Sequence, residues 1–142
     1  MKKTRILFWV ATVIIFIMEG VLPALTSQTE LAKEGIRHLG YPVYFGNMLV
    51  VFKVAGALAL LLPPVPARVK EWAYAGFAFD FIAAAVSHGA TDGFGNFQTF
   101  FPLIFLVVLV VSYTNYHKLA NAAAPVTRSG SHTQFNKNTA VV

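Results

Sequence analysis

Two apolar stretches, joined by a short polar turn, each contain one charged residue where a membrane-spanning segment normally has none. The first stretch covers residues 43–62 and contains Lys53, and the second covers residues 72–89 and contains Asp80. An ion at the centre of a span costs roughly 2.5 to 3.5 kcal/mol on insertion scales, so two unpaired ions are a heavy burden for a small protein. The pattern therefore predicts a transmembrane hairpin with an opposite-charge pair inside it.

The composition places the chain among membrane proteins. Of its 142 residues, 56% are hydrophobic and 12% are charged, against about 25% charged in ordinary soluble domains. Four apolar runs are each close to the ~20 residues that cross a ~30 Å hydrocarbon core, and they are apolar nearly all round. We predict an all-α integral membrane four-helix bundle over residues 1–118, followed by a polar, disordered cytoplasmic tail over residues 119–142. The predicted spans are about 6–25, 43–62, 72–89 and 97–116.

Lysine and arginine predict the orientation of the bundle. With the N-terminus inside, the outer side holds only Lys33 and Arg37, so both termini are predicted to be cytoplasmic. The net charge of +5 then belongs to flanks that contact anionic lipid headgroups, and it requires no nucleic-acid partner. The predicted cytoplasmic basic residues are Lys2, Lys3, Arg5, Arg68, Lys70, Lys118, Arg128 and Lys137.

The first outer loop is predicted to contain a short helix. Ser27 and Glu30 have the spacing of a capping box, in which two side chains satisfy the free amides at a helix start. The helix would run from residue 28 to about residue 39 and end at Gly40. It is either a solvated loop helix or a functional lid on the bundle.

Depth in the membrane predicts which charges meet. Lys53 lies about ten residues, ~15 Å, below the outer surface, and Asp80 lies about eight residues, ~12 Å, above the inner one. The two are therefore nearly level in a ~30 Å core, and Glu19 on the first span lies about one turn farther out. Two interpretations stay open: a buried ion pair that fixes helix register, or a polar cavity for a small ligand, a proton or a quinone headgroup. Ser87 and His88 follow Asp80 on its span and complete the candidate intramembrane site.

Other chemistry has little support in the sequence. The chain contains no cysteine, which excludes disulfides, a thiol nucleophile and Cys-ligated metal centres. No nucleophile–base pair, phosphate loop or metal-ligand set appears, so we predict no metal and no catalytic residues. At the inner surface, Lys70, Glu71 and Trp72 fit the start of a helix, with docking of a partner protein as the alternative.

Several short motifs along the chain form a characteristic combination. They are Leu39-Gly40-Tyr41-Pro42, Lys53 with Gly56, Leu61-Leu62-Pro63, the run from Lys70 to Phe77, and Ser87-His88. The combination resembles the DoxX-like family of small four-span bacterial membrane proteins. The likeness covers about residues 6–118.

The resemblance implies a location and a direction for function. Relatives that gave the family its name are associated with a membrane thiosulfate:quinone oxidoreductase, and others with redox homeostasis or with assembly of membrane partners. We therefore expect a bacterial inner-membrane protein that is a non-catalytic subunit or accessory factor of a quinone-linked redox system. It would work with a membrane protein partner or as a homo-oligomer. No cofactor is predicted, and a quinone is the one alternative. A small-molecule or proton-linked transporter is the alternative, and a stand-alone enzyme ranks third.

Overall fold

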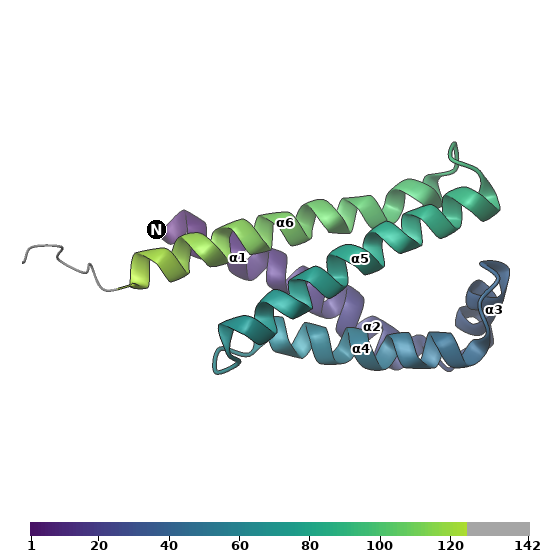
Figure 1. The fold of residues 1–142 in the computed structure, drawn as a ribbon, viewed down its shortest axis with the longest axis horizontal. Coiled ribbons are helices and arrows are strands. Elements are labelled where there is room, and N and C mark those ends of the chain that lie inside the picture. The colour runs from purple at the N-terminus through teal and green to yellow at the C-terminus, as the bar shows by residue number, and fades with distance from the viewer. Residues whose placement is uncertain (125–142) are drawn as a thin grey trace, which may run out of the picture.

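The computed structural model describes residues 1–124, which fold into helices (Figure 1). Within these residues there is no β-strand, which confirms the predicted all-α fold class. The elements are α1 (Lys2–Ile15), the π-helical segment η1 (Phe16–Val21), α2 (Leu22–Thr26), α3 (Glu30–His38), α4 (Val43–Leu61), α5 (Ala67–Asp92) and α6 (Phe97–Ala123).

Three of the long helices have the length and apolar composition to cross a membrane. They are the continuous helix Lys2–Thr26, which joins α1, η1 and α2, and the helices α4 and α6. Helix α5 is 26 residues long but is not among the three, and it contains Asp80 near its middle. The helical membrane protein is thus confirmed, while α5 as a fourth span stays a prediction.

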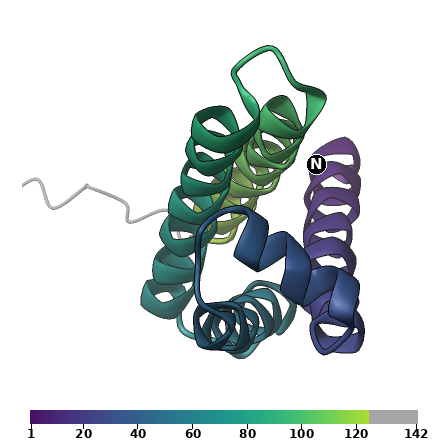
Figure 2. The same cartoon turned by 90° about the vertical axis from the view of Figure 1, so that its right-hand side faces the viewer.

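The N-terminal helix crosses the bundle from one partner to another. Its first part, α1, packs against α6, whereas η1 packs against α4, and α5 packs against both α4 and α6. Helices α4 and α5 lie close at the loop that joins them and diverge toward the opposite end of the bundle (Figure 1). Helix α3 lies across that opposite end (Figure 2). We call this end of the bundle the α3 end, and we call the end at which α4 and α5 are joined the N-terminal end.

The core of the bundle is aromatic and aliphatic, and a small polar network crosses it. The hydroxyl of Ser112 on α6 lies 2.8 Å from Thr12 Oγ1 on α1 and 2.8 Å from the Tyr74 hydroxyl on α5. Around the outside, large apolar side chains such as Phe52 and Phe79 are exposed, as lipid-facing positions are. The buried cluster consists of Ile15, Ala57, Leu60, Tyr74, Phe77, Phe81, Phe105 and Leu109.

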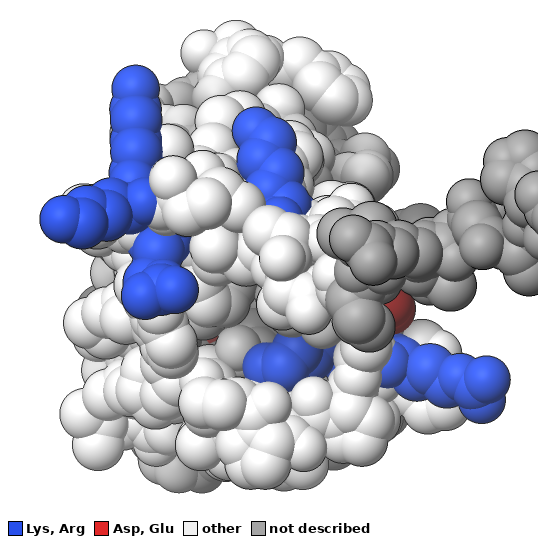
Figure 3. All heavy atoms as spheres, turned by 90° about the vertical axis from the view of Figure 1, so that its left-hand side faces the viewer, with Lys and Arg blue, Asp and Glu red and all other residues white. Residues whose placement is uncertain are grey.

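The two ends of the bundle differ in charge. At the α3 end, Lys33 and Arg37 are paired with Glu30 and Glu34 on the same helix. At the N-terminal end, lysine and arginine side chains gather on the surface (Figure 3). These come from the first turns of α1 and α5 and from the last turns of α6, and they are Lys2, Lys3, Arg5, Arg68 and Lys118 among the exposed or half-buried residues.

Helix α3 begins later than predicted. Thr29, not Ser27, is its N-cap, because Thr29 Oγ1 accepts a hydrogen bond from the Ala32 amide at 3.3 Å. The amide of Ser27 instead donates to the Pro23 carbonyl at 2.9 Å, so Ser27 still belongs to the end of α2. Gly40 follows α3 with a φ of +85°, a conformation that glycine adopts readily and that ends the helix.

The last helix extends farther than predicted. Helix α6 continues to Ala123, so residues 119–123 extend the last helix instead of leaving it. The remainder of the predicted tail, from residue 125 and including Arg128 and Lys137, lies outside the described residues.

Candidate functional site

Lys53 lies at the middle of α4 between two carboxylates that come from different helices. Its Nζ donates a hydrogen bond to Glu19 Oε2 at 2.7 Å and lies 3.1 Å from Asp80 Oδ2. The three side chains are 21%, 11% and 15% exposed for Lys53, Glu19 and Asp80. The structure therefore brings together the three charged residues that lie at a similar predicted depth. We call them the charged triad.

A local distortion carries Glu19 toward α4. In η1 the amide of Leu22 donates to the carbonyl of Ile17, five residues back, as in a π-helix. Pro23 has no amide hydrogen and its ring crowds the carbonyl of Glu19, four residues earlier, so the regular α-helical pattern cannot continue there. Single π-helical turns of this kind occur often at functional sites. The proline four residues after a buried glutamate is the sequence signal for this turn.

Gly20 lets η1 approach α4 closely. A Cβ atom added at Gly20 would lie 2.8 Å from the Cβ of Ala57 on α4, which is closer than real Cβ atoms come. The two backbones can therefore meet only because position 20 has no side chain. This close crossing lies one residue from Glu19 and one turn from Lys53. It sets the distance at which their side chains pair.

The charged triad is not internally satisfied. Asp80 Oδ2 is buried, and its ion-pair partner is the Lys53 ammonium at 3.1 Å. An ammonium has three N–H donors, and Lys53 has two carboxylate partners within the described residues. Two carboxylates also face a single cation. The triad thus retains one free donor, carboxylate lone pairs and room for one proton.

A groove between α4 and α5 leads to the triad. Its volume is about 660 Å³, within the ~300–1,000 Å³ of small-molecule sites. Lys53 and Asp80 are the charged groups on its wall, and the rest of the wall is apolar or small. The groove is bounded at its rim by exposed aromatic side chains, so it faces the surroundings of the bundle. These and other wall residues include Phe45, Phe52, Trp72, Gly76 and Phe79.

Ser87 and His88 lie apart from the triad. Ser87 Oγ is 2.8 Å from the Tyr41 hydroxyl, and His88 Nδ1 is 3.0 Å from Asp92 Oδ2. His38 at the end of α3 contacts the other oxygen of Asp92. These contacts join the loop after α3, and α3 itself, to the end of α5. Sequence reasoning did not single out His38 or Asp92, because a loop residue and a helix end 54 positions apart share no pattern.

The two histidines affect the chemistry of Asp92. Their hydrogen bonds, first that of His88 and then that of His38, hold the pKa of the Asp92 carboxyl below its ordinary value. The described residues contain no group of three His, Cys, Asp or Glu side chains arranged to hold a metal ion. Asp92, with its partners His38 and His88, links α3 to the end of α5. Because its pKa is lowered, the Asp92 carboxylate stays ionised in moderately acidic solution.

The three residues of the predicted inner-surface motif point in different directions. Lys70 is 6% exposed and directs its ammonium at the last carbonyls of α4. Glu71 Oε1 lies 2.8 Å from His117 Nε2 on α6. Trp72 is 74% exposed and contributes to the wall of the α4–α5 groove. Helix α5 already begins at Ala67, so the motif does not start the helix but lies within its first two turns. Lys70 closes the turn after α4, and Trp72 borders the groove.

Comparison with protein-family models identifies a family for this chain. A family model described as the DoxX-like family matches residues 7–112, a segment that contains the whole charged triad and both walls of the groove. Separate comparisons with curated proteins and with solved structures found no match.

Proposed function

The chain belongs to the DoxX-like family, and from that premise we propose that it binds a membrane quinone as an accessory subunit of a redox system. The quinone head would sit at Lys53 and Asp80, with its tail in the α4–α5 groove. The catalytic step would belong to a membrane protein partner, bound directly or to a homo-oligomer of this chain. The protein would be a multi-pass component of a bacterial inner membrane.

The topology in this proposal has four spans. At ~1.5 Å per residue, the 26 residues of α5 extend about 39 Å, which is enough to cross a ~30 Å core. Its central charge, Asp80, is directed at Lys53 and not at lipid. The basic N-terminal end of the bundle would be cytoplasmic, since lysine and arginine accumulate on that side of membranes. Both termini would then be inside.

The observation that carries the proposal is the unsatisfied pair at the groove wall. A quinone carbonyl is an acceptor, which a free N–H of Lys53 can bind, and a quinol hydroxyl is a donor, which Asp80 Oδ2 can accept. The Asp80 carboxylate has more lone pairs than its one ion-pair partner occupies, so it can accept a further hydrogen bond from a ligand. A bound quinone supplies two-electron chemistry coupled to proton uptake and release. Lys53 and Asp80 would orient its head.

The groove suits the rest of such a ligand. Its wall offers aromatic and small side chains, and its rim is exposed where the bundle meets lipid. Gly76 contributes open space, because a Cβ added there meets no atom within 4 Å. A polyisoprenoid tail could thus enter from the bilayer without crossing the protein.

A small-molecule or proton-linked carrier is the second candidate. It is favoured by one specific observation, which is that Lys53 also lines a separate cavity on the other side of α4. A residue that lines two separate cavities can meet a ligand or a proton from either one, as a carrier requires. Proton flux into sealed liposomes that contain the protein but no quinone would favour this alternative.

Tryptophan fluorescence can test quinone binding directly. The chain has two tryptophans, so Trp9→Phe leaves Trp72 at the groove as the only reporter. A short-tailed benzoquinone titrated into the protein in lipid nanodiscs should quench Trp72 in a saturable manner. Lys53→Met should raise the Kd at least about tenfold, equivalent to ~1.4 kcal/mol.

A matched pair of variants separates the groove from nonspecific partition into lipid. Gly76→Leu fills the groove without a clash at its Cβ and should weaken binding by a similar factor. Ala90→Leu adds the same side chain at an exposed position of α5 outside the groove and should leave the Kd unchanged. Equal quenching in all variants would show partition into lipid and would refute the proposal.

A further inference from the structure

A second cavity lies beneath α3, on the other side of α4 from the groove. Its volume is about 200 Å³, which is room for several water molecules. It lies between the end of α2, helix α3 and the first half of α4. Its polar wall residues are Thr26, Ser27, Lys33, Asn47 and Lys53.

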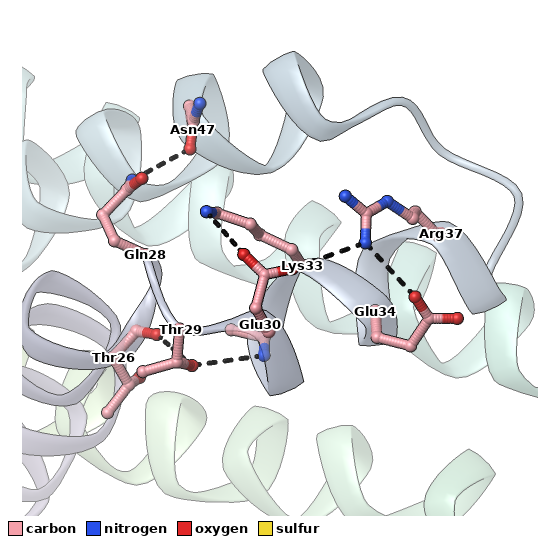
Figure 4. Close-up of polar contacts among 9 residues, drawn as sticks. Thr26, Gln28, Thr29, Glu30, Lys33, Glu34, Arg37 and Asn47 are labelled. Atoms are coloured by element: carbon pink, nitrogen blue, oxygen red, sulfur yellow. Dashed lines mark hydrogen bonds and ion pairs between the residues drawn. The ribbon is translucent and has the colours of Figure 1, made fainter.

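Helix α3 is fitted closely over this cavity. A Cβ added at Gly46 on α4 would lie 2.9 Å from Ile36 Cγ1, so α3 rests where α4 lacks a side chain. Gln28 Nε2 donates to Asn47 Oδ1 at 3.1 Å, which ties the start of this cover to α4 (Figure 4). Thr26 and Asn47 are exposed, so the cavity reaches the surface beside these residues.

The two cavities meet at one turn of α4. Leu49 and Lys53, four residues apart, are the two residues that line both of them. Both walls are largely apolar, but the groove carries only Lys53 and Asp80 as charged groups, whereas the cavity beneath α3 also presents hydroxyl and amide groups. This cavity opens at the surface beside polar side chains, so water can enter it. The groove instead suits lipid tails.

We propose that the cavity beneath α3 is a water-filled vestibule through which the charged triad exchanges protons with the aqueous phase on the α3 side. Two carboxylates against one ammonium can hold one additional proton, and Lys53 stands in the wall between the vestibule and the groove. The site is then served by two phases. A lipophilic ligand arrives sideways from the bilayer, and protons arrive from the solution at the α3 end.

The inference rests on the proposed function only in assigning the proton to the chemistry of a bound quinone. Access itself can be tested without a quinone, because the chain contains no cysteine and single cysteines can be introduced one at a time. Leu49→Cys places a thiol where the two cavities meet. Met48→Cys is its matched control, since Met48 is the next residue, is 44% exposed and lines neither cavity.

The reagent is a charged, membrane-impermeant methanethiosulfonate added to sealed vesicles of either orientation. Gly35→Cys, at an open and exposed position on α3, identifies which face of the vesicle is the α3 side. We expect Leu49→Cys to react from that side at least about tenfold faster than Met48→Cys. Such a rate means that water reaches Leu49, one turn of α4 from Lys53, because a charged reagent does not enter through lipid.

Equal rates for Leu49→Cys and Met48→Cys, or reaction only from the opposite side, would overturn the vestibule. If Leu49→Cys does not fold, Val50→Cys replaces it, since Val50 also lines the cavity beneath α3. Fast labelling without saturable quinone quenching would keep the vestibule and reject the quinone. The reverse result would keep the quinone site and reject the vestibule.

Discussion

Lys53 and Lys70 are both lysines largely withdrawn from the surface of the same bundle, yet their surroundings differ. The ammonium of Lys70 donates to three backbone carbonyls, those of Ala59 at 2.9 Å, Leu60 at 3.0 Å and Leu62 at 2.8 Å. Lys53 makes one hydrogen bond and one further ion pair, and it borders two cavities.

The contrast distinguishes a structural lysine from a candidate binding residue. The last carbonyls of a helix lack partners within it, and a cation there also meets the negative end of the helix dipole. Lys70 therefore completes α4 and has no donor left for a ligand. Lys53 bonds to no backbone carbonyl among the described residues, and it keeps an unused N–H donor beside the Asp80 carboxylate. Burial alone does not mark a site, whereas unused hydrogen-bonding capacity beside a cavity does.

The largest effect on stability is expected from removing the cation of the triad. Lys53→Met leaves two carboxylates facing each other without a partner, and breaking a buried pair costs about 3–5 kcal/mol. Unfolding in a mixed-detergent titration, followed by circular dichroism, measures the loss. The triple variant Glu19→Gln, Lys53→Met, Asp80→Asn removes all three charges and should recover most of the stability. A triple variant as unstable as the single one would contradict this account.

Lys70→Met should cost less, about 2–3 kcal/mol, because hydrogen bonds from a charged donor are lost but no like charges are left facing each other. The same unfolding titration measures it. Quinone quenching of Trp72 in the folded variant should keep its wild-type Kd, in contrast to Lys53→Met. Lys70→Arg keeps the charge, and its stability should lie between those of the wild type and Lys70→Met. A changed Kd in Lys70→Met would erase the distinction between the two lysines.

The close crossing beside the triad gives a third effect. Gly20→Ala places a methyl group against Ala57 and should cost about 1–3 kcal/mol, as overpacked cores do, while lengthening the Glu19–Lys53 contact. The double variant Gly20→Ala, Ala57→Gly restores the volume and should recover stability in the same titration. Gly76→Ala is the control with open space. Equal stability of Gly20→Ala and wild type would mean that the helices can separate freely.

Much of the fold followed from apolar run length and from the depth of charges. Runs of about 20 residues fixed three helices able to span, and levels counted from the run ends placed Lys53, Asp80 and Glu19 within reach. The count worked because an ion in an apolar span must find a partner, and few are available. Helix α5 is not among the three helices apolar enough to span, since Asp80 and other polar residues lower its mean hydropathy.

The remainder depends on three-dimensional details that a linear pattern does not contain. Pro23 signals a distortion near Glu19, but the close approach of Gly20 to Ala57, which lies far along the chain, has no such signal. Lys70 appeared as a flanking surface charge, because the predicted hairpin does not show that this side chain is directed at the last carbonyls of α4. His38 and Asp92 meet only after α3 folds across the bundle. Local propensity is silent about such contacts.

The smallest effect is expected at the α3 end, where the fastening is exposed and titratable. Asp92, beyond the predicted span 72–89, has a folded-state pKa below its ordinary 3.8 because His88 and His38 donate hydrogen bonds to it. A lowered carboxyl pKa stabilises the fold above pH 3.8, and that contribution is lost as the pH falls through the lowered value. A spin label at Gly35→Cys should therefore gain mobility below pH 3.8. Glu30 and Glu34 are two further carboxylates on α3, so Asp92→Asn is the comparison: it should be mobile already at neutral pH and change less on acidification. An identical acid response in both proteins would assign the loosening to those glutamates and would exclude Asp92 as its cause.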